Sequence, residues 1–508
     1  MLRTHAKKIK FNLISAVLCQ VVTIAIGFIL PRLYLENFGS TVNGVLSTIK
    51  QIFTYLCLLE AGIGLATAQA LLKPVAQSDY ASVNGILSAT KRHYEKTGVI
   101  YALSVLAIAL FYGFAVDTGL APYTVIALVL LNGIPSLVTF FVQGKYQILM
   151  ETDGRQYVIT NSQIALQIVS GFGKIAVLLL TDNLILVQAS YCLFAVLQLL
   201  YLTVYARRTY RWLDLRVAPD TRAIAQKNSV LVHQISSMIF NNTDILLLSF
   251  LCDFRVVSVY YIYNLFFSQV ELFVSGLAKG LHFALGQLFS VDRARFLEKF
   301  SVYEMCYIAV NFAIYTLMCV FLLPVIQIYT GGISDANYIN PLLLFLFVLA
   351  KLFHCGKLPV NQVVEYSGHF SNTAWQAVSE MVINITVSVV CILRWGICGA
   401  LIGTIAALVF RAVAIIDFSN RKILRRSVWN TYALWLINGA VFTAIFLIFG
   451  TTYFCDLRFG ALLWRGVLHA LWIVPLYLTA NLALQPKRAR LLLQMLKRKE
   501  KIHEPVHK

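Results

Sequence analysis

An acid inside an apolar run is the feature of this sequence that most directly suggests chemistry. Asp244 lies in FNNTDILLLSF, residues 240 to 250, which is otherwise typical of a membrane-spanning helix. The spacing of His233, Asn241 and Asp244 places them on one face of that helix. A carboxylate in hydrocarbon is costly and usually belongs to an ion or substrate pathway. We therefore interpret these residues, together with Glu271, as candidate ion-coupling sites for H⁺ or Na⁺.

Cations and an amide form a second set of intramembrane polar residues. Asn43 and Lys50 lie at helical spacing, and Lys50 is roughly 15 Å into its span. Lys351 has a comparable depth in a later span, and Arg411 lies about 22 Å into another. Such side chains would stabilise a negatively charged ligand through charge-assisted hydrogen bonds. We predict that Lys50, Lys351, Arg411 and Asn43 bind an anionic substrate.

Both sets have a structural alternative. The polar face that contains Asp244 could pack against another helix through hydrogen bonds. The cations could pair with nearby acids, for which the candidates are Glu60, Glu271, Glu380 and, close to Arg411, Asp417. Other intramembrane lysines are expected to extend toward the membrane interface and receive no role, namely Lys174, Lys279 and Lys357.

The elements that position these residues are membrane spans. Hydrophobic residues make up 59% of the 508, charged residues only 13%, and the mean hydropathy is +0.74, which excludes a soluble globular chain. About 20 apolar residues cross the roughly 30 Å of hydrocarbon. Runs of this kind predict an all-α integral membrane protein with about fourteen spans. They lie near residues 11–35, 41–72, 97–116, 123–148, 157–181, 184–206, 229–251, 256–289, 303–329, 341–366, 375–393, 396–417, 429–449 and 461–483.

The distribution of Lys and Arg predicts how these spans are oriented. With the N-terminus inside, 31 of the 42 Lys and Arg fall in cytoplasmic segments, as the positive-inside rule requires. Both termini are therefore predicted to be cytoplasmic. The net charge of +19 is then mostly topological, with some attraction of the C-terminal KRKEK to anionic lipid head groups. No nucleic-acid partner is expected.

The sequence gives little indication of a metal site or of an enzyme active site. The ten cysteines form no CxxC and no Cys/His spacing that suits a metal, so we expect neither a metal site nor a disulfide framework. No long loop carries a carboxylate cluster that could serve as a catalytic base, which disfavours a membrane glycosyltransferase or polymerase. We expect a transporter that uses no organic cofactor.

An internal repeat with a period near 213 residues organises the chain. Asp79 recurs as Asp292, and Gly154 recurs as Gly368. The repeat predicts an N-terminal six-helix lobe at residues 1–216, a C-terminal six-helix lobe at 217–426, and two additional helices with a basic cytoplasmic tail at 427–508. Paired helical repeats around a midplane site are common in transporters.

Four segments of the chain carry a family resemblance: NFGSTVNGVLSTIKQIFTYLCLLEAGIG, VHQISSMIFNNTDILLLS, YTGGISDANYI and SGHFSNTAWQAVSEMVINITVS. With the duplicated six-span arrangement, they resemble the bacterial polysaccharide exporters called oligosaccharide or O-antigen flippases. These proteins share a superfamily with the multidrug and toxin extruders and the lipid II flippases, the multidrug/oligosaccharidyl-lipid/polysaccharide (MOP) exporters.

The resemblance implies a multi-pass protein of the bacterial cytoplasmic (inner) membrane. Such a protein flips an undecaprenyl-pyrophosphate-linked oligosaccharide outward by alternating access between two lobes around a central cavity. This activity would serve capsule, O-antigen or exopolysaccharide synthesis. The implied partners are the lipid-linked oligosaccharide and the lipid bilayer, with a polysaccharide polymerase and glycosyltransferases as further candidates.

Two departures from relatives narrow the substrate. Lipid II flippases carry an Arg-Asp pair in the first span and further arginines in the second, whereas here the first span offers LPRLYL and the second Lys50. Multidrug extruders move organic cations and tend to line the cavity with carboxylates, whereas this chain has Lys50, Lys351 and Arg411 beside Asp244 and Glu271. The charge balance favours an anionic cargo. A proton- or sodium-coupled multidrug antiporter is the first alternative, and a lipid II flippase is less favoured.

Overall fold

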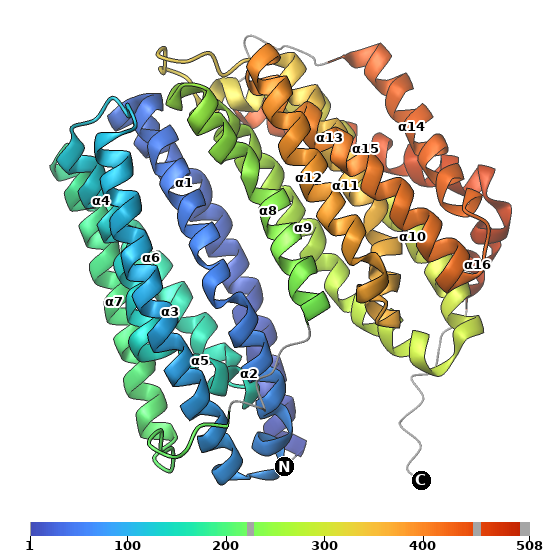
Figure 1. The fold of residues 1–508 in the computed structure, drawn as a ribbon. Helices are drawn as coiled ribbons and strands as arrows, with labels where there is room; N and C mark the ends of the chain where they lie inside the picture. Colours follow the sequence, from blue (N-terminus) through green and yellow to red (C-terminus); the bar gives the residue numbers. More distant parts are fainter. Residues whose placement is uncertain (1, 221–227, 451–458, 498–508) are drawn as a thin grey trace. The chain divides into compact units, whose positions relative to one another are not determined.

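Helices account for every regular element in the part of the chain that the computed structural model describes, residues 2–220, 228–450 and 459–497 (Figure 1). The all-α prediction is therefore confirmed. The elements up to residue 251 are α1 (Leu2–Leu56), α2 (Leu58–Gln77), α3 (Tyr80–Phe114), α4 (Pro122–Val138), η1 (Thr139–Gln143), α5 (Gly144–Thr152), α6 (Gln156–Leu180), α7 (Leu184–Thr209) and α8 (Asn228–Leu251). They are followed by α9 (Phe254–Val291), α10 (Arg293–Tyr329), α11 (Pro341–Ser367), α12 (Phe370–Trp395), α13 (Ile397–Phe418), η2 (Ser419–Leu424), α14 (Trp429–Phe449), α15 (Phe459–Leu484) and α16 (Pro486–Lys497). The segments η1 and η2 are short π-helical turns.

The landmarks of the sequence repeat have matching local structures. Asp79 precedes α3 and Asp292 precedes α10, and each carboxylate accepts a hydrogen bond from a backbone N–H in the first turn, at 3.1 and 3.0 Å. Such caps satisfy a donor that has no partner within the helix. Gly154 and Gly368 both have positive φ, 73° and 68°, which glycine adopts without strain. The repeated residues therefore perform the same local function in both halves of the chain.

The long helix α1 breaks at Gly39, where the sequence predicts the boundary between the first two spans. Gly39 has φ 78° and ψ −179°, a conformation that favours glycine. Immediately after it, the Ser40 N–H and hydroxyl donate to the Asp335 carboxylate at 2.7 and 2.6 Å. A Cβ at position 39 would lie 2.9 Å from Asp335 Oδ2. The break is thus maintained by glycine geometry and by a fixed acid beside it.

The helices group into two compact units, which we describe separately. Unit 1 contains Met1–Tyr261 and Gly332–Ala336, and unit 2 contains Ile262–Gly331 and Asn337–Lys508. In unit 1, α1 packs against α6 and α8, α6 against α7, and α3 against α4. In unit 2, α13 packs against α11 and α12, and α10 packs against α11, α14 and α15. The lobes predicted at 1–216 and 217–426, with an addition at 427–508, stay a prediction.

The helices are suited in length and composition to a lipid bilayer. Eleven of those described are long and apolar enough to cross a membrane, and Ile235–Leu251 within α8 is a shorter apolar helix. The chain is therefore a multi-pass membrane protein. The fourteen sequence-predicted spans coincide with helical residues, apart from one or two residues at the ends of some spans and Cys57 between α1 and α2. Their number and the cytoplasmic placement of both termini stay predictions, and residues 498–508 of the basic tail lie outside the described part.

Helix α10 runs through the interior of unit 2. Its side chains Phe296 and Phe300 are fully buried, and they belong to an apolar core with Val360 and Val363 of α11 and Ile415 of α13. Few water molecules can reach polar groups in such an environment. A charge on this helix must therefore find its partners within the protein.

Candidate functional site

The predicted polar face around Lys50 contains one residue that packs against another helix and one that is exposed. Asn43 is 3% exposed, and its Nδ2 donates to Ser258 Oγ at the start of α9, at 2.7 Å. The helices approach closely here, since a Cβ on Gly44 would lie 1.9 Å from Phe254 O. Lys50, two turns after Asn43, is exposed. Asn43 therefore connects two helices, whereas the Lys50 side chain is exposed.

Lys50 has a second cation as its neighbour. Lys174 of α6 is half-buried, with Nζ 4.2 Å from the ring centroid of Tyr191 on α7, and it is close enough to Lys50 for the two charges to interact. Among the side chains that the structure describes, no acid lies within ion-pair distance of either lysine. The side chain of Glu60 is not among those described. Two neighbouring positive charges without an acid between them form a site that an anion would stabilise.

Asp244 is buried within unit 1. It is 8% exposed, and its Oδ2 accepts a hydrogen bond from Tyr260 OH of α9 at 2.6 Å. Asn241, one turn earlier on α8, is exposed, and His233 is half-buried. The predicted polar face therefore spans different environments, and Tyr260 is a partner that the sequence did not indicate. Ion coupling by these residues stays a prediction.

Glu271 and Lys351 form one cluster in unit 2. The sequence predicted different roles for them, ion coupling for Glu271 and substrate binding for Lys351. Lys351 Nζ on α11 donates to Glu271 Oε2 on α9 at 2.6 Å, and His354 Nε2 lies 3.2 Å from Glu271 Oε1. The Glu271 side chain is 32% exposed and that of Lys351 is 20% exposed. One partly exposed acid thus faces two basic groups, as the structural alternative expects.

A second cluster of unit 2 buries Glu380 between two cations. Lys357 Nζ of α11 donates to Glu380 Oε1, and Arg411 Nε of α13 lies 3.5 Å from Oε2. Arg411 also donates from Nη1 to Gln376 Oε1 at 2.9 Å. The charged side chains are at most 9% exposed. The expectation that Lys357 extends to the interface is wrong, because its acid lies on the next helix, and Arg411 pairs with Glu380 rather than with Asp417.

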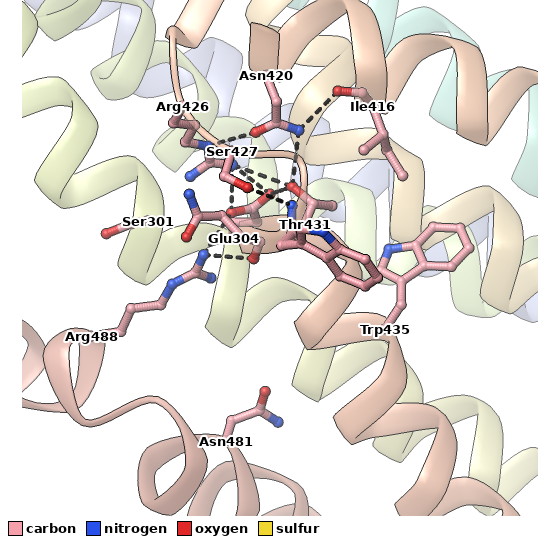
Figure 2. Close-up of polar contacts among 12 residues, drawn as sticks. Ser301, Glu304, Ile416, Asn420, Arg426, Ser427, Thr431, Trp435, Asn481 and Arg488 are labelled. Carbon is pink, nitrogen blue, oxygen red and sulfur yellow. Dashed lines mark hydrogen bonds and ion pairs between the residues drawn. The ribbon is translucent and has the colours of Figure 1, made fainter.

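A third cluster centres on Glu304 of α10, which is 0% exposed. Arg426 donates from Nη2 to its two carboxylate oxygens at 2.9 and 2.8 Å, and Thr431 Oγ1 donates at 2.7 Å. Arg488 Nη2 of α16 lies 3.5 Å from the same carboxylate and donates to Asn430 O at 2.7 Å. Figure 2 shows both guanidinium groups directed at Glu304. The cluster ties α16 and the start of α14 to α10.

The sequence offered a signal for this third cluster that the predictions did not use. Glu304 stands in SVYEMCYIAV, where most of the surrounding residues are apolar. Its partners Arg426 and Arg488 served only as markers of cytoplasmic loops. Arg426 also donates from Nε to Asn420 Oδ1 at 2.6 Å, and its guanidinium lies 5.3 Å from the Phe300 ring centroid. This arginine therefore has a structural role in the fold.

The described acids do not gather into a cluster that could bind a coupling ion with several carboxylates. Within the described side chains there is no group of three or more His, Cys, Asp and Glu that could hold a metal ion. Three acids of unit 2, Glu271, Glu380 and Glu304, each face two basic groups instead. For H⁺ or Na⁺, Asp244 and Glu271 stay the predicted positions.

Comparison with known proteins shows what kind of fold carries these clusters. Neither a family model nor a curated protein matches the sequence. The lipid II flippase MurJ in an inward closed conformation has a TM-score of 0.66 at 14% identity, over 94% of this chain and 99% of that chain. The chain has the fold of the MOP superfamily transporters. This fold agrees with the all-helical membrane architecture that the sequence predicts.

Two further MOP structures differ from this chain more than MurJ does. An inward-facing multidrug resistance transporter of the MATE family has a TM-score of 0.59 at 15% identity, over 82% of this chain and 96% of that chain. A MOP superfamily transporter from Pyrococcus furiosus, described as having a binding pocket of reverse polarity, has a TM-score of 0.53 at 13% identity, over 83% and 97%. The shared MOP fold spans nearly the full length of all three proteins. The polysaccharide exporter family within the superfamily stays a prediction.

Proposed function

We propose that this chain is a flippase. Its substrate is an undecaprenyl-pyrophosphate-linked oligosaccharide, which it moves from the inner to the outer leaflet of the bacterial cytoplasmic membrane by alternating access. The product would supply capsule, O-antigen or exopolysaccharide synthesis. The observation that carries the proposal is Lys50, an exposed cation within a candidate span. Its charge interacts with that of Lys174, and no acid is paired with it among the described side chains.

The physical argument is one of charge compensation. A pyrophosphate that leaves water loses hydration energy, and charge-assisted hydrogen bonds to lysine replace part of it. An intramembrane lysine without an acid is itself unfavourable, so its presence favours a role in binding an anion. Lys50 and Lys174 together supply the two positive charges that a pyrophosphate requires. Lys351 and Arg411 are weaker candidates, because each already has an acidic partner.

Ion coupling is the second part of the proposal, with Asp244 and Glu271 as the exchanging acids and H⁺ or Na⁺ as the ion. Glu271 is the more accessible of the two, and Asp244 is held by Tyr260. Asp244→Asn keeps the shape and the hydrogen bond, so transport should continue but lose its response to an imposed gradient. Reconstituted vesicles with flipping measured at several gradients would test this. A normal gradient response would remove Asp244 from the coupling mechanism.

The main alternative is a cation-coupled multidrug antiporter, which the likeness to a MATE transporter supports. Lys50 and Lys174 argue against it, because they would repel a cationic drug. Expression in a flippase-deficient strain that accumulates lipid-linked repeat units separates the two functions. Our proposal requires that the intermediate reaches the outer leaflet. Increased resistance to cationic drugs, with the intermediate retained inside, would establish the antiporter instead.

A further inference from the structure

A groove of about 650 Å³ runs between α6 and α7 on unit 1. On α6 it extends from Tyr157 to Val169, and on α7 from Phe194 to Tyr205. The lining residues of each helix recur at three- or four-residue intervals, so they follow one helix face. Gln198 Nε2 donates to Ser162 Oγ across the groove at 2.8 Å, which fixes the register of the two helices. The groove is therefore formed by the fixed packing of α6 against α7.

The groove changes from polar to apolar along its length. Tyr157, Tyr201 and Tyr205 stand toward one end, whereas Val169 and Phe194 form the other. Twelve residues of α6 separate Tyr157 from Val169, so the groove is roughly 18 Å long. Tyrosine suits the boundary between water and hydrocarbon, because it combines an apolar ring with a polar hydroxyl. This gradient matches a molecule with a polar head and one hydrocarbon chain.

Basic side chains lie just beyond the polar end of the groove. Arg208 follows Tyr205 by three residues, so it continues the face of α7 that lines the groove, and its side chain is exposed. Arg155 precedes α6 and donates from Nη1 to Tyr205 OH at 3.1 Å. Asp153 compensates Arg155 through a 2.6 Å ion pair. The excess positive charge therefore comes from Arg207 and Arg208 at the end of α7.

Asp153, an acid at this end of the groove, is held in place by two donors. Asp153 accepts a hydrogen bond from Tyr210 OH at 2.9 Å as well as its ion pair with Arg155. Burial and the nearby Asp153 carboxylate raise the pKa of the Tyr210 phenol, so that it keeps its proton and continues to donate. Because two donors occupy Asp153, an anion that approaches the groove meets mainly the α7 arginines.

We infer that this groove binds one acyl chain of an anionic phospholipid, with the phosphate near Arg208 and the chain directed toward Val169. Both helices are candidate membrane spans. One leaflet provides about 15 Å of hydrocarbon, half of the whole core, which is close to the length of the groove. A polyprenyl chain that reaches through both leaflets would be too long for it. The inference does not depend on which cargo the protein carries.

Photocrosslinking of the full-length protein tests this lipid site. The protein is reconstituted in phosphatidylcholine vesicles that contain either phosphatidylglycerol or phosphatidylcholine with a diazirine in the acyl chain. We expect phosphatidylglycerol to label peptides 157–169 and 194–205 more strongly than phosphatidylcholine. Arg208→Gln, at an exposed position, should lower that preference about fivefold, the effect of one basic residue near an anionic membrane surface. Ala165→Trp, which fills the groove, should abolish labelling by both lipids.

A matched variant on α7 separates the groove from general lipid contact. Leu197 is 51% exposed and does not line the groove, so Leu197→Trp should leave labelling unchanged. Equal labelling by the two lipids, or labelling that persists in Ala165→Trp, would overturn the inference. Undecaprenyl phosphate is added as competitor at increasing concentration in a further arm. If it displaced phosphatidylglycerol at equal concentration, the occupant would be the polyprenyl lipid and the phospholipid assignment would be wrong.

Discussion

In unit 1, Lys50 and Lys174 bring two positive charges together inside candidate membrane spans, and no described acid pairs with either of them. In unit 2, three acids of the helix bundle each face two basic side chains: Glu271, Glu380 and Glu304. The two units share a repeat in their sequence and matching helix caps. They differ in whether intramembrane charge is compensated by the protein itself.

This difference separates structural charge from charge that is available for binding. A buried ion pair holds helices in one arrangement, and its loss leaves an uncompensated charge in a low-dielectric interior. A cation without an acidic partner does not stabilise the fold. A role in binding a ligand explains its presence in the membrane better. Substitutions in the buried clusters around Glu304 and Glu380 should therefore act on stability, whereas substitution of Lys50 should act on transport.

The largest effect on stability should come from Glu304→Gln. The change leaves Arg426 and Arg488 without the carboxylate that compensates them, which costs about 3–5 kcal/mol. The midpoint of thermal unfolding in detergent should fall by at least about 6 °C. Glu304→Gln combined with Arg488→Gln should recover part of the loss, because one buried cation is removed.

An exposed acid provides the control for Glu304. Glu36 pairs with Arg32 at 2.6 Å, but its side chain is 44% exposed. Since exposed ion pairs contribute about 1 kcal/mol or less, Glu36→Gln should leave the midpoint nearly unchanged. Equal shifts for the two variants would contradict the account of unit 2.

Lys357→Met should have the next largest effect on stability. Glu380 keeps Arg411 as a partner, so the loss is that of one charged hydrogen bond, about 1.5–3 kcal/mol. A double-mutant cycle with Glu380→Gln measures the interaction directly. We expect the double variant to be more stable than the sum of the two single losses predicts. Simple additivity would show that Lys357 and Glu380 do not interact in the membrane.

Lys351→Met should destabilise the protein less, because Glu271 and Lys351 are partly exposed. We expect about 1 kcal/mol or less from unfolding measurements. The double variant Lys351→Met with Glu271→Gln tests the two interpretations of Lys351. If stability and export both recover in the double variant, Lys351 is a structural partner of Glu271. Loss of export that persists would assign Lys351 to the cargo.

The smallest effect on stability is expected for Lys50→Ala. The side chain is exposed and has no paired acid among the described residues, so the change in unfolding free energy should stay within about 0.5 kcal/mol. Membrane abundance and the midpoint of unfolding are the measurements. A fall as large as that of Lys357→Met would mean that Lys50 supports the fold, and the contrast between the units would no longer hold.

Much of the helical architecture could be predicted because it depends on local properties. Hydropathy located the spans on helical residues, and Gly39 separates the first two where the apolar pattern divides. The repeat aligned Asp79 with Asp292, which proved to be equivalent caps. These features depend on residues a few positions apart, so one sequence contains the necessary information.

The pairing of charges could not be predicted in the same way. Lys357 and Glu380 lie on different helices, and Glu304 meets arginines more than 100 residues later in the chain. Which acid meets which base depends on how the helices pack, and helical periodicity describes only one helix at a time. The sequence therefore identified Lys50, Lys351 and Arg411 as intramembrane cations. It did not show which of them have an acidic partner.

Export of lipid-linked oligosaccharide by Lys50 variants tests the central claim most directly. The variants are expressed in a flippase-deficient strain at equal membrane abundance, and the lipid-linked intermediate is measured in each leaflet. We predict that Lys50→Ala abolishes export and that Lys50→Arg retains part of it, because arginine keeps the positive charge that holds the pyrophosphate. Export by Lys50→Ala at the unmodified rate would show that the uncompensated cation of unit 1 does not bind the cargo.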